Sequence, residues 1–368
     1  MAATVTIRDV ARAAQVSVAT VSRALNGHDN VTDAVRRRVL AVANEMRYSP
    51  HHAARSLSSR RTHTIGVVLP DLHGEFFSEL MRGIDQVARE SGLHLLVSSY
   101  HGHPEEQASA LRAMRGRVDG LLVMSPHAGD LDFLGENLAA LPAVLINSQA
   151  ADSGQIAFGI DNYIGARTMV EHLLSAGHRR IAFIAGPANN FDAYERQRGY
   201  RDALADADAA LVPWVLPGDF GEASGYAAGQ ALLAAAERPQ AVFAANDMMA
   251  LGCLFALNQA GVRVPDEIAL AGFDDIPLAR YVVPSLTTMR VKIDELGAHA
   301  MRLLLELQDG GDVRGRLSPQ MPELIVRESS VAKAREDVGR DDDGRGGERT
   351  TERKRTSVKR DAGAGKRN

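Results

Sequence analysis

Polar side chains stand at the ends of several short apolar runs, where they could hold a ligand by hydrogen bonds. The positions are Asp71, Ser125, Asp161, the pair Asn246 and Asp247, and the pair Asp274 and Asp275. In open parallel sheets, ligands bind beyond the carboxyl ends of the strands. Carboxylate, amide and hydroxyl groups at so many strand ends suit a ligand rich in hydroxyl or amine groups. Some of these residues could instead cap helices, with Asp247 and its counterpart Asn162 as the main candidates.

The elements that must position these side chains alternate in type from residue 64 onward. Strands are expected at 64–70, 93–99, 120–125, 143–147, 180–185, 212–216, 241–245 and 268–273, and helices at 75–90, 104–115, 162–176, 191–207, 222–236, 247–260 and 292–307. Alternation of strand and helix favours parallel sheets with right-handed crossovers. Two such series, each of about 100 to 130 residues, predict two doubly wound subdomains with a ligand cleft between them.

A second group of candidate residues lies near the amino terminus, between Thr6 and Asn26. Two short helical patterns flank a tight break there. Thr6 and Asp9 can form a capping box for the first helix, and Ser17 can cap the second. Two helices joined by so short a turn are typical of a helix-turn-helix, whose second helix can enter a DNA major groove. An ordinary helical hairpin would show the same spacing.

Charge is distributed unevenly along the 368 residues, a length that suits two or three domains. Residues 1–61 carry ten Arg against four acidic residues, and residues 331–368 carry twelve Lys or Arg against eight. The net charge of −4 therefore leaves −14 on the segment between them. A basic front end on an acidic body suits a small nucleic-acid-binding module attached to another domain.

Composition also restricts the compartment and the chemistry. No run is long enough to span a bilayer, and the amino terminus lacks the apolar region of a signal peptide, so we expect a cytoplasmic protein. The single cysteine, Cys253, lies in an apolar stretch and is expected in the core. Phosphate-binding loops, nucleophile elbows and cysteine-based metal motifs are absent, which argues against an enzyme. His101 and His103 could bind a metal, but two histidines on a loop are mostly incidental.

Several motifs together carry a family resemblance. They are T-I-R-D-V-A (6–11), V-S-V-A-T-V-S-R-A-L-N (16–26), Y-S-P (48–50), A-A-R-S-L (53–57), T-I-G-V-V-L-P (64–70), D-N-Y-I-G-A (161–166), E-R-Q-R-G-Y (195–200), A-N-D-M-M-A-L-G (245–252) and G-F-D-D-I (272–276). In this order and spacing they resemble the LacI/GalR family of bacterial repressors along nearly the whole chain except the tail. The combination is highly specific, whereas each motif alone is only moderately so.

The resemblance implies roles in DNA binding. Val18 and Ala19 occupy the two positions that read base edges, and both are apolar, which favours contact with thymine methyl groups. Arg23 matches an arginine that can pair with guanine. Leu57 matches a hinge-helix leucine that wedges into the minor groove, and Ala53 lets two hinge helices approach closely. Ser17, Thr20 and Ser22 would contact phosphate or sugar. Thr6 and Asn26 are further DNA-binding candidates.

The resemblance also implies an effector site. Arg196 would grip the ligand, and Asp274 would accept hydrogen bonds from it across the cleft. The remaining candidates are the polar Ser125, Asp161 and Asn246 and the aromatic Phe76, Phe77 and Phe220, whose rings would face a sugar or a base. Asn190 stands where a purine-binding relative has a second arginine, which favours a neutral sugar over a purine. Tyr200 and Phe273 lie in the same motifs but are expected in the core, and Asn147 replaces an aspartate frequent in the family.

These expectations divide the chain into four segments. They are a helix-turn-helix DNA-binding domain (1–48), a hinge helix and linker (49–63), an effector-binding and dimerisation domain (64–330) and a disordered charged tail (331–368). Within the body, subdomain 1 comprises 64–161 and 290–322, and subdomain 2 comprises 162–289 and 323–330. Helix faces of the first half that include Met81 and Ile84 are candidates for the dimer interface or for the core.

The predicted fold is a small all-α helix-turn-helix domain plus an α/β, periplasmic-binding-protein-like body of two doubly wound parallel-sheet subdomains. The main alternative function is a sugar-binding protein of a transport system, which shares the body's architecture but needs export. We therefore expect a homodimeric repressor that binds a pseudo-palindromic operator, associates with the nucleoid when bound and responds to a small carbohydrate. No catalytic residue, metal, cofactor or membrane partner is expected.

Overall fold

The computed structural model describes most of the chain. The described residues are 5–25, 30–48, 61–126, 138, 141–148, 156–313 and 318–331. The predicted hinge helix with Ala53 and Leu57 lies outside the described residues, as do Asn26 and the predicted tail from residue 332 onward.

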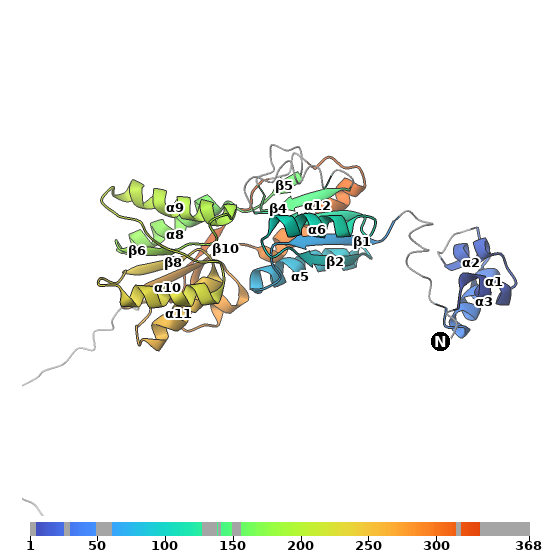
Figure 1. Cartoon of the computed structure of the whole chain (residues 1–368), viewed down its shortest axis with the longest axis horizontal. Coiled ribbons are helices and arrows are strands. Elements are labelled where there is room, and N and C mark those ends of the chain that lie inside the picture. The colour runs from blue at the N-terminus through green and yellow to red at the C-terminus, as the bar shows by residue number, and fades with distance from the viewer. Residues whose placement is uncertain are drawn as a thin grey trace, which may run out of the picture. The chain divides into compact units, whose positions relative to one another are not determined.

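Three helices form the amino-terminal domain: α1 (Ile7–Ala13), α2 (Val18–Leu25) and α3 (Asp33–Glu45). They share a small core of buried apolar residues that includes Val10, Val21 and Val39. Only four residues separate α1 from α2, so the predicted helix-turn-helix is confirmed. This domain is drawn at the blue end of the chain in Figure 1.

Both predicted amino-terminal caps of these helices are present. The Asp9 carboxylate accepts a hydrogen bond from the Thr6 backbone N–H (2.9 Å), and Asp9 completes the capping box of α1. Ser17 Oγ accepts from the Thr20 backbone N–H at 3.1 Å, as an N-cap of α2. These bonds satisfy donors that the first helical turn leaves unpaired, and they fix where each helix begins.

The body consists of two sheets, each covered by helices on both faces (Figure 1). Subdomain 1 contains β1 (Thr64–Leu69), α5 (Glu75–Glu90), β2 (His94–Ser99), α6 (Pro104–Met114), β3 (Gly120–Met124), β4 (Ala143–Ile146), β5 (Ile156–Phe158) and α12 (Ile293–Gln308). Its strands run parallel in the order β2-β1-β3-β4-β5. The predicted doubly wound organisation is confirmed for this half.

Subdomain 2 repeats this organisation on a six-stranded sheet. It contains α8 (Asn162–Ser175), β6 (Ile181–Ile184), α9 (Phe191–Ala207), β7 (Trp214–Leu216), α10 (Glu222–Ala234), β8 (Ala241–Ala244), α11 (Asp247–Gln259), β9 (Ala269–Asp274), the 3₁₀ helix η2 (Pro277–Arg280), β10 (Thr287–Arg290) and β11 (Glu323–Ile325). The strand order is β11-β10-β9-β8-β6-β7, and only the edge strand β11 runs antiparallel to its neighbour. In Figure 1, α8 and α9 lie on one side of this sheet and α10 and α11 on the other.

The predicted and observed elements differ mainly in short strands. The predicted strand at 212–216 begins only at Trp214, because Pro213 has no N–H to donate to the sheet. Three short strands, β5, β10 and β11, were not predicted, because their three or four residues are too few to show a periodicity. All three lie close to the points where the chain passes between the two sheets, so they complete the junction of the subdomains.

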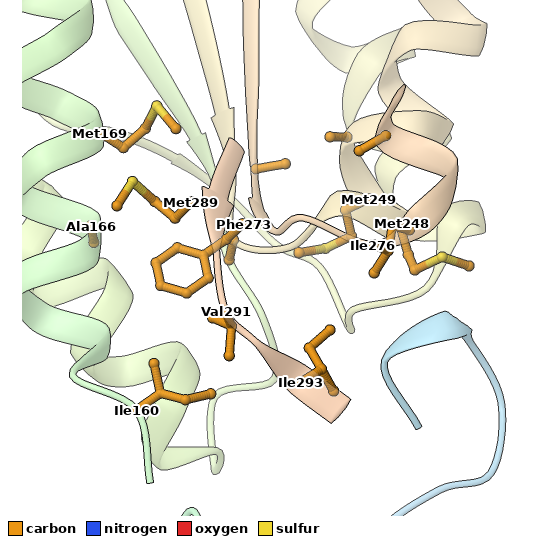
Figure 2. Close-up of a cluster of buried hydrophobic side chains, with 14 of the residues drawn as sticks. Ile160, Ala166, Met169, Met248, Met249, Phe273, Ile276, Met289, Val291 and Ile293 are labelled. Carbon is orange, nitrogen blue, oxygen red and sulfur yellow. The ribbon is translucent and has the colours of Figure 1, made fainter. Parts of the chain in front are cut away.

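Buried apolar side chains fill the space around the passage between the sheets. In Figure 2, Phe273 of β9 and Met289 of β10 face Met169 of α8, while Ile160 and Val291 lie closer to the crossing segments. All five are at most 9% exposed and belong to one core cluster that extends through both subdomains. This shared core therefore packs together the strands of both subdomains whose ends carry the polar candidate residues.

Helices α5 and α12 of subdomain 1 pack with their backbones nearly in contact. A Cβ atom added at Gly83 would lie 1.9 Å from the Asp294 carbonyl oxygen, and one at Gly297 would lie 2.2 Å from the Leu80 carbonyl oxygen. Ile84 is fully buried in this contact, so it belongs to the core and not to a surface available for dimerisation. Among the described residues, no helix is both long and apolar enough to cross a membrane.

Candidate functional site

Arg196 is the centre of the candidate effector site. Its side chain projects from α9, is 4% exposed, and has three polar partners on three different elements. Nε donates to Asn162 Oδ1 at 2.7 Å, Nη1 donates to the Ala245 carbonyl oxygen at 2.6 Å, and Nη1 lies 3.2 Å from Asp274 Oδ1. The guanidinium carbon lies 3.8 Å from the centre of the Phe273 ring. A buried arginine requires such partners, because an unpaired buried charge is strongly unfavourable.

Two buried carboxylates, those of Asp274 and Asp192, interact with the positive charge of Arg196. Burial raises the pKa of Asp274 to about 7, and the Arg196 guanidinium partly opposes that rise. Burial likewise raises the pKa of Asp192 to about 6, opposed first by Arg196 and then by hydrogen bonds from Asn147 and Asn162. One guanidinium therefore faces two desolvated carboxylates, and the site has no excess positive charge.

Two polar atoms beside this network, Ser125 Oγ and Asn147 Oδ1, are buried but have no hydrogen-bond partner within the described part of the chain. Asp274 Oδ1 is also buried, and its partner is the Arg196 guanidinium at 3.2 Å. Ser125 follows β3 and Asn147 follows β4, its neighbour in the sheet, while Asp274 ends β9 of subdomain 2. The strand-end rule thus brings predicted residues of both subdomains to one junction. A buried polar atom without a partner indicates a place where a ligand or water belongs.

Asp161 and Asn246, predicted as ligand contacts, each serve as a helix N-cap. Asp161 Oδ1 accepts from the Ile164 N–H at 2.9 Å at the start of α8, and Asn246 Oδ1 accepts from the Met249 N–H at 3.0 Å at the start of α11. Asn162 and Asp247, which were predicted as possible caps, are instead the first residues of these helices and lie buried. Each cap is therefore the residue before the predicted one.

The three predicted aromatic residues lie at two places. Phe76 and Phe77 are half-buried on the first turn of α5, and their rings meet edge to face with centroids 5.5 Å apart. Phe220 adopts a φ of +72° and places its ring centre 5.8 Å from the Arg196 guanidinium carbon. The structure therefore brings Phe220 to the arginine directly. Phe76 and Phe77 have no such contact with Arg196 among the interactions of the described residues. The first turn of α5, on which they lie, contacts subdomain 2 through Glu75 Oε2, which accepts from the Leu278 N–H at 3.1 Å.

Asp192 is the residue of this site that the sequence analysis missed. It is 6% exposed, and its two carboxylate oxygens accept hydrogen bonds from Asn147 Nδ2 (3.0 Å) and Asn162 Nδ2 (2.9 Å). The available signal was its spacing of four residues from Arg196, which places an acid and an arginine on the same face of a helix.

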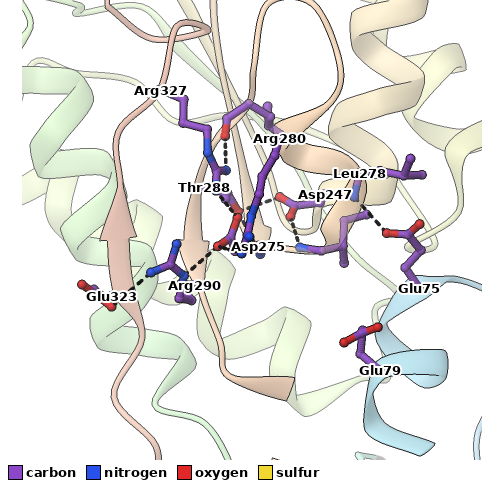
Figure 3. A network of polar contacts seen from close by, with 12 residues as sticks. Glu75, Glu79, Asp247, Asp275, Leu278, Arg280, Thr288, Arg290, Glu323 and Arg327 are labelled. Carbon is purple, nitrogen blue, oxygen red and sulfur yellow. Dashed lines mark hydrogen bonds and ion pairs between the residues drawn. The ribbon is translucent and has the colours of Figure 1, made fainter. Parts of the chain in front are cut away.

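Asp274 and Asp275, adjacent in sequence, have unrelated surroundings. The fully buried Asp275 side chain pairs with Arg290 at 2.7 Å, with Arg280 at 3.6 Å and with Arg327, a network drawn in Figure 3. It therefore stabilises the crossing strands. The two carboxylates do not face one another as a catalytic pair.

Asp247 also has a structural role beside this network. Its carboxylate accepts from Thr288 Oγ1 at 2.6 Å and from the Ile276 N–H at 3.0 Å, and burial raises its pKa well above the ordinary value. These bonds join α11 to β10 and to the segment that follows β9 (Figure 3).

The candidate DNA-binding helix α2 presents the predicted residues on one exposed face. Val18 is 41% exposed, although it is apolar, and Ala19 and Arg23 are also exposed, whereas Val21 and Ala24 are buried. The polar candidates differ in how much of their surface is exposed to solvent. Thr6 and Ser17 are exposed, Thr20 and Ser22 are half-buried, and the Ser17 and Thr20 hydroxyls lie 2.8 Å apart in a hydrogen bond.

The residues expected to be structural are in the core. Tyr200 is fully buried and its hydroxyl donates to the Ile181 carbonyl oxygen at 2.8 Å, and Phe273 is fully buried beneath Arg196. Cys253 is also fully buried, and burial raises the pKa of its thiol to about 12. Within the described residues, no cluster of three or more His, Cys, Asp or Glu side chains could hold a metal ion.

The pKa of Asp274 generates a prediction for stability. In the unfolded chain an Asp has a pKa of ~3.9, so between that value and about 7 the native state holds a proton that the unfolded state has lost. The unfolding free energy contributed by this group is fully present at acidic pH and falls by up to ~1.4 kcal/mol per pH unit as pH rises through this window. Asp274→Asn should flatten the pH dependence of urea unfolding between about pH 5 and 7.

The single tryptophan, Trp214, lies in β7 of subdomain 2 and reports this unfolding by its fluorescence. Asp309→Asn, at an exposed position after α12, is the matched control and should keep the wild-type slope. An unchanged slope in Asp274→Asn would contradict the assignment of the raised pKa to this carboxyl.

Comparisons with known proteins identify the same two-part organisation of the chain. Residues 6–51 match the model of bacterial regulatory proteins of the lacI family, and residues 170–330 match a periplasmic binding protein-like domain. The chain is 34% identical over 328 residues to the ribose operon repressor of Haemophilus influenzae, and 37% identical over 330 residues to the transcriptional repressor PurR of Aliivibrio fischeri strain MJ11. Each alignment covers 88% of this chain and 98% of the relative.

A solved structure of the Lac repressor dimer bound to operator and the anti-inducer ONPF is also similar. It has a TM-score of 0.80 at 28% identity, with 90% of this chain and all of that chain covered. The helix-turn-helix, the two wound subdomains and similarity over nearly the full length of the relatives lead to one assignment. The chain belongs to the lacI family of bacterial regulatory proteins and is a DNA-binding transcriptional repressor with an effector-binding domain.

Proposed function

We propose that this repressor binds a pseudo-palindromic operator as a homodimer and is controlled by an uncharged sugar or sugar derivative bound around Arg196. The observation that carries the effector assignment is the junction itself, where a buried arginine with partners on three elements lies beside two buried polar atoms without a hydrogen bond, Ser125 Oγ and Asn147 Oδ1. The function places the protein in the cytoplasm, in contact with the nucleoid when it occupies its operator.

The charge of the site favours a neutral effector. Arg196 is already paired with Asp274 and shares its surroundings with Asp192, so an anionic ligand would have to displace a carboxylate. Asp274 Oδ1 and Asn147 Oδ1 can each accept a hydrogen bond from a hydroxyl group, and the Ser125 hydroxyl can accept or donate one. The Phe220 ring adds an apolar face.

A purine effector has less support. Asn190 Oδ1 accepts from the Ala193 N–H at 3.0 Å as the N-cap of α9, so this position supplies no second cation. The names of the relatives do not decide between the two ligand classes, because one is a ribose operon repressor and the other is PurR.

On the DNA side, we propose that Val18 and Ala19 contact base edges through apolar surface and that Arg23 makes the strongest base contact. Their exposure on one face of α2 supports this assignment. The proposed contacts of Thr6, Ser17, Thr20, Ser22 and Asn26 with the backbone, and the roles of Ala53 and Leu57 in a hinge helix, rest on the family resemblance.

The effector class can be tested by a thermal-shift screen of the full-length protein. A ligand that binds only the native state at 100 times its dissociation constant stabilises it by ~2.7 kcal/mol. We expect neutral monosaccharides or disaccharides to raise the melting temperature, and Arg196→Ala to abolish the shift. A shift produced only by purine bases or by phosphorylated sugars would contradict the proposal.

Sequence-specific DNA recognition can be tested with duplexes that the protein itself selects from a random pool. Arg23→Ala should weaken binding to the selected sequence by about 10- to 100-fold, as expected for loss of a bidentate base contact, and should leave nonspecific binding nearly unchanged. Arg37→Ala, at an exposed position of α3, is the control and should preserve selectivity. Undiminished selectivity of Arg23→Ala in a competition gel shift would refute the role.

The proposed dimer has a candidate surface on α10 and α11. A shallow apolar groove of about 340 Å³ is lined there by Tyr226, Leu251 and Phe255, among others, and Phe255 is 58% exposed. A second copy is the occupant that the function requires, because two recognition helices must be placed one helical turn apart on the operator. The structural similarity to the Lac repressor dimer supports a two-fold assembly.

Phe255→Asp should therefore shift the protein from dimer to monomer in sedimentation velocity experiments, because a charge in an apolar interface is strongly unfavourable. Val212→Asp is the control, since Val212 is 82% exposed between α9 and β7 and lies away from the groove. If both variants sediment as the wild type does, this surface is not the dimer interface.

A further inference from the structure

The first turn of α9 contacts subdomain 1 through two adjacent hydrogen bonds. The Phe191 backbone N–H donates to the Pro126 carbonyl oxygen at 2.7 Å, just after β3. Asn147 Nδ2, just after β4, donates to Asp192 Oδ2 at 3.0 Å. All four residues lie at carboxyl ends of strands or at the start of a helix, so these two bonds hold the two subdomains together beside the effector site.

The orientation of the amides in this network follows from the chemistry of Arg196. A guanidinium only donates, so the Asn162 oxygen must face it, and the Asn162 amino group must face Asp192. Asp192 already accepts from Asn162 on one oxygen, and its second oxygen accepts from Asn147. Each bond therefore fixes the direction of the next, from Arg196 through Asn162 and Asp192 to Asn147.

We propose that Asp192 and Asn147 form a latch between the subdomains, and that Asp192 is the positioning residue through which the state of Arg196 changes the closure of the junction. When a ligand draws the guanidinium, the Asn162 oxygen loses or shifts its donor, and the carboxylate that holds Asn147 moves with it. The inference rests on the proposed effector role of Arg196, but the latch itself is a property of the protein without ligand.

Other contacts between the subdomains lie at a different place and are independent of this network. Glu75 Oε2 accepts from the Leu278 N–H, and His73 Nε2 lies 3.5 Å from Glu222 Oε2. They join the start of α5 to η2 and α10. Because they share no residue with the latch, their loss serves as a control for general loosening of the junction.

An exchange of donor and acceptor tests the latch. Asn147→Asp places a second carboxylate against Asp192. Asp192→Asn removes the charged acceptor but leaves a weaker, neutral hydrogen bond, because the Asn147 amide can rotate and its otherwise unpartnered oxygen can accept from the amide at 192. In the double variant, the amide at 192 can accept from Asn162 and donate to the carboxylate at 147, so the bond is restored with its direction reversed. The backbone at 147 has a φ of +49°, a conformation that Asn and Asp both tolerate.

Hydrogen exchange at the Phe191 amide is the primary readout, because its bond to Pro126 opens when the latch opens. We expect Asn147→Asp to accelerate this exchange by about 10- to 100-fold, the range for losing a hydrogen bond to a charged group, and Asp192→Asn to accelerate it less, because a neutral hydrogen bond replaces the charged one. The double variant should return the exchange toward the wild-type rate. Small-angle scattering should show a larger radius of gyration for the single variants only. Glu75→Gln should leave the Phe191 amide protected.

Arg196→Lys tests the connection to the effector site. A lysine cannot reproduce the fork that bonds Asn162 and the Ala245 carbonyl together, so exchange at Phe191 should accelerate although no latch atom is altered. Unfolding followed by Trp214 fluorescence checks that each variant folds, and Asn147→Ser is the milder replacement if Asn147→Asp does not. Exchange that is unchanged in Asn147→Asp, or a double variant that exchanges as fast as Asn147→Asp, would overturn the latch.

These outcomes are distinguishable from failure of the proposed function. An unchanged Phe191 amide in Arg196→Lys, combined with accelerated exchange in the single latch variants, would overturn the connection to Arg196 and leave the sugar screen as an independent measurement. Failure of every sugar to stabilise the protein would contradict the effector class and would not alter the exchange rates.

Discussion

The burial of one positive charge constrains the whole junction between the subdomains. Arg196 is 4% exposed, and a guanidinium in such surroundings must be matched by acceptors and by opposite charge. Its acceptors come from the ends of β8 and β9 and from the start of α8. Three elements far apart in sequence are thereby held at fixed distances around one side chain, and a ligand that engages this side chain acts on all of them at once.

The same constraint explains why the neighbouring carboxylates differ in role. Burial raises the pKa values of Asp274 and Asp192 toward neutrality, and the positive charge of the Arg196 that they share partly opposes this rise. Asp275 is equally buried but has three arginines of its own, so it serves as a fixed point for the crossing strands. A residue of the candidate effector site and a structural anchor thus lie one residue apart, because successive side chains of an extended chain point to opposite faces.

Much of this arrangement could be predicted from the sequence, because periodicity and strand ends are local signals. The bounds of α5 and α9 agree with the sequence analysis to the residue, since amphipathic spacing continues to their ends. The caps were less accessible: Asp161 and Asn246 serve α8 and α11, although Asn162 and Asp247 have equally suitable side chains. Only the backbone direction at each strand end decides which neighbour faces the helix and which turns inward. Asp192 was missed for a related reason: its partner Asn147 is 45 residues away in the sequence, and only the folded structure brings the two side chains together.

The close approach of α5 and α12 has a consequence for how subdomain 1 can move. Gly83 and Gly297 place the backbone of each helix against a carbonyl oxygen of the other, so that no larger side chain fits at either position. Helix α5 begins beside the junction, at Glu75, and α12 begins directly after the crossing at Lys292. The two helices therefore form one closely packed unit. If this unit rotates as a whole about the junction, the end of α5 that lies 16 residues away is displaced further than the end at the junction.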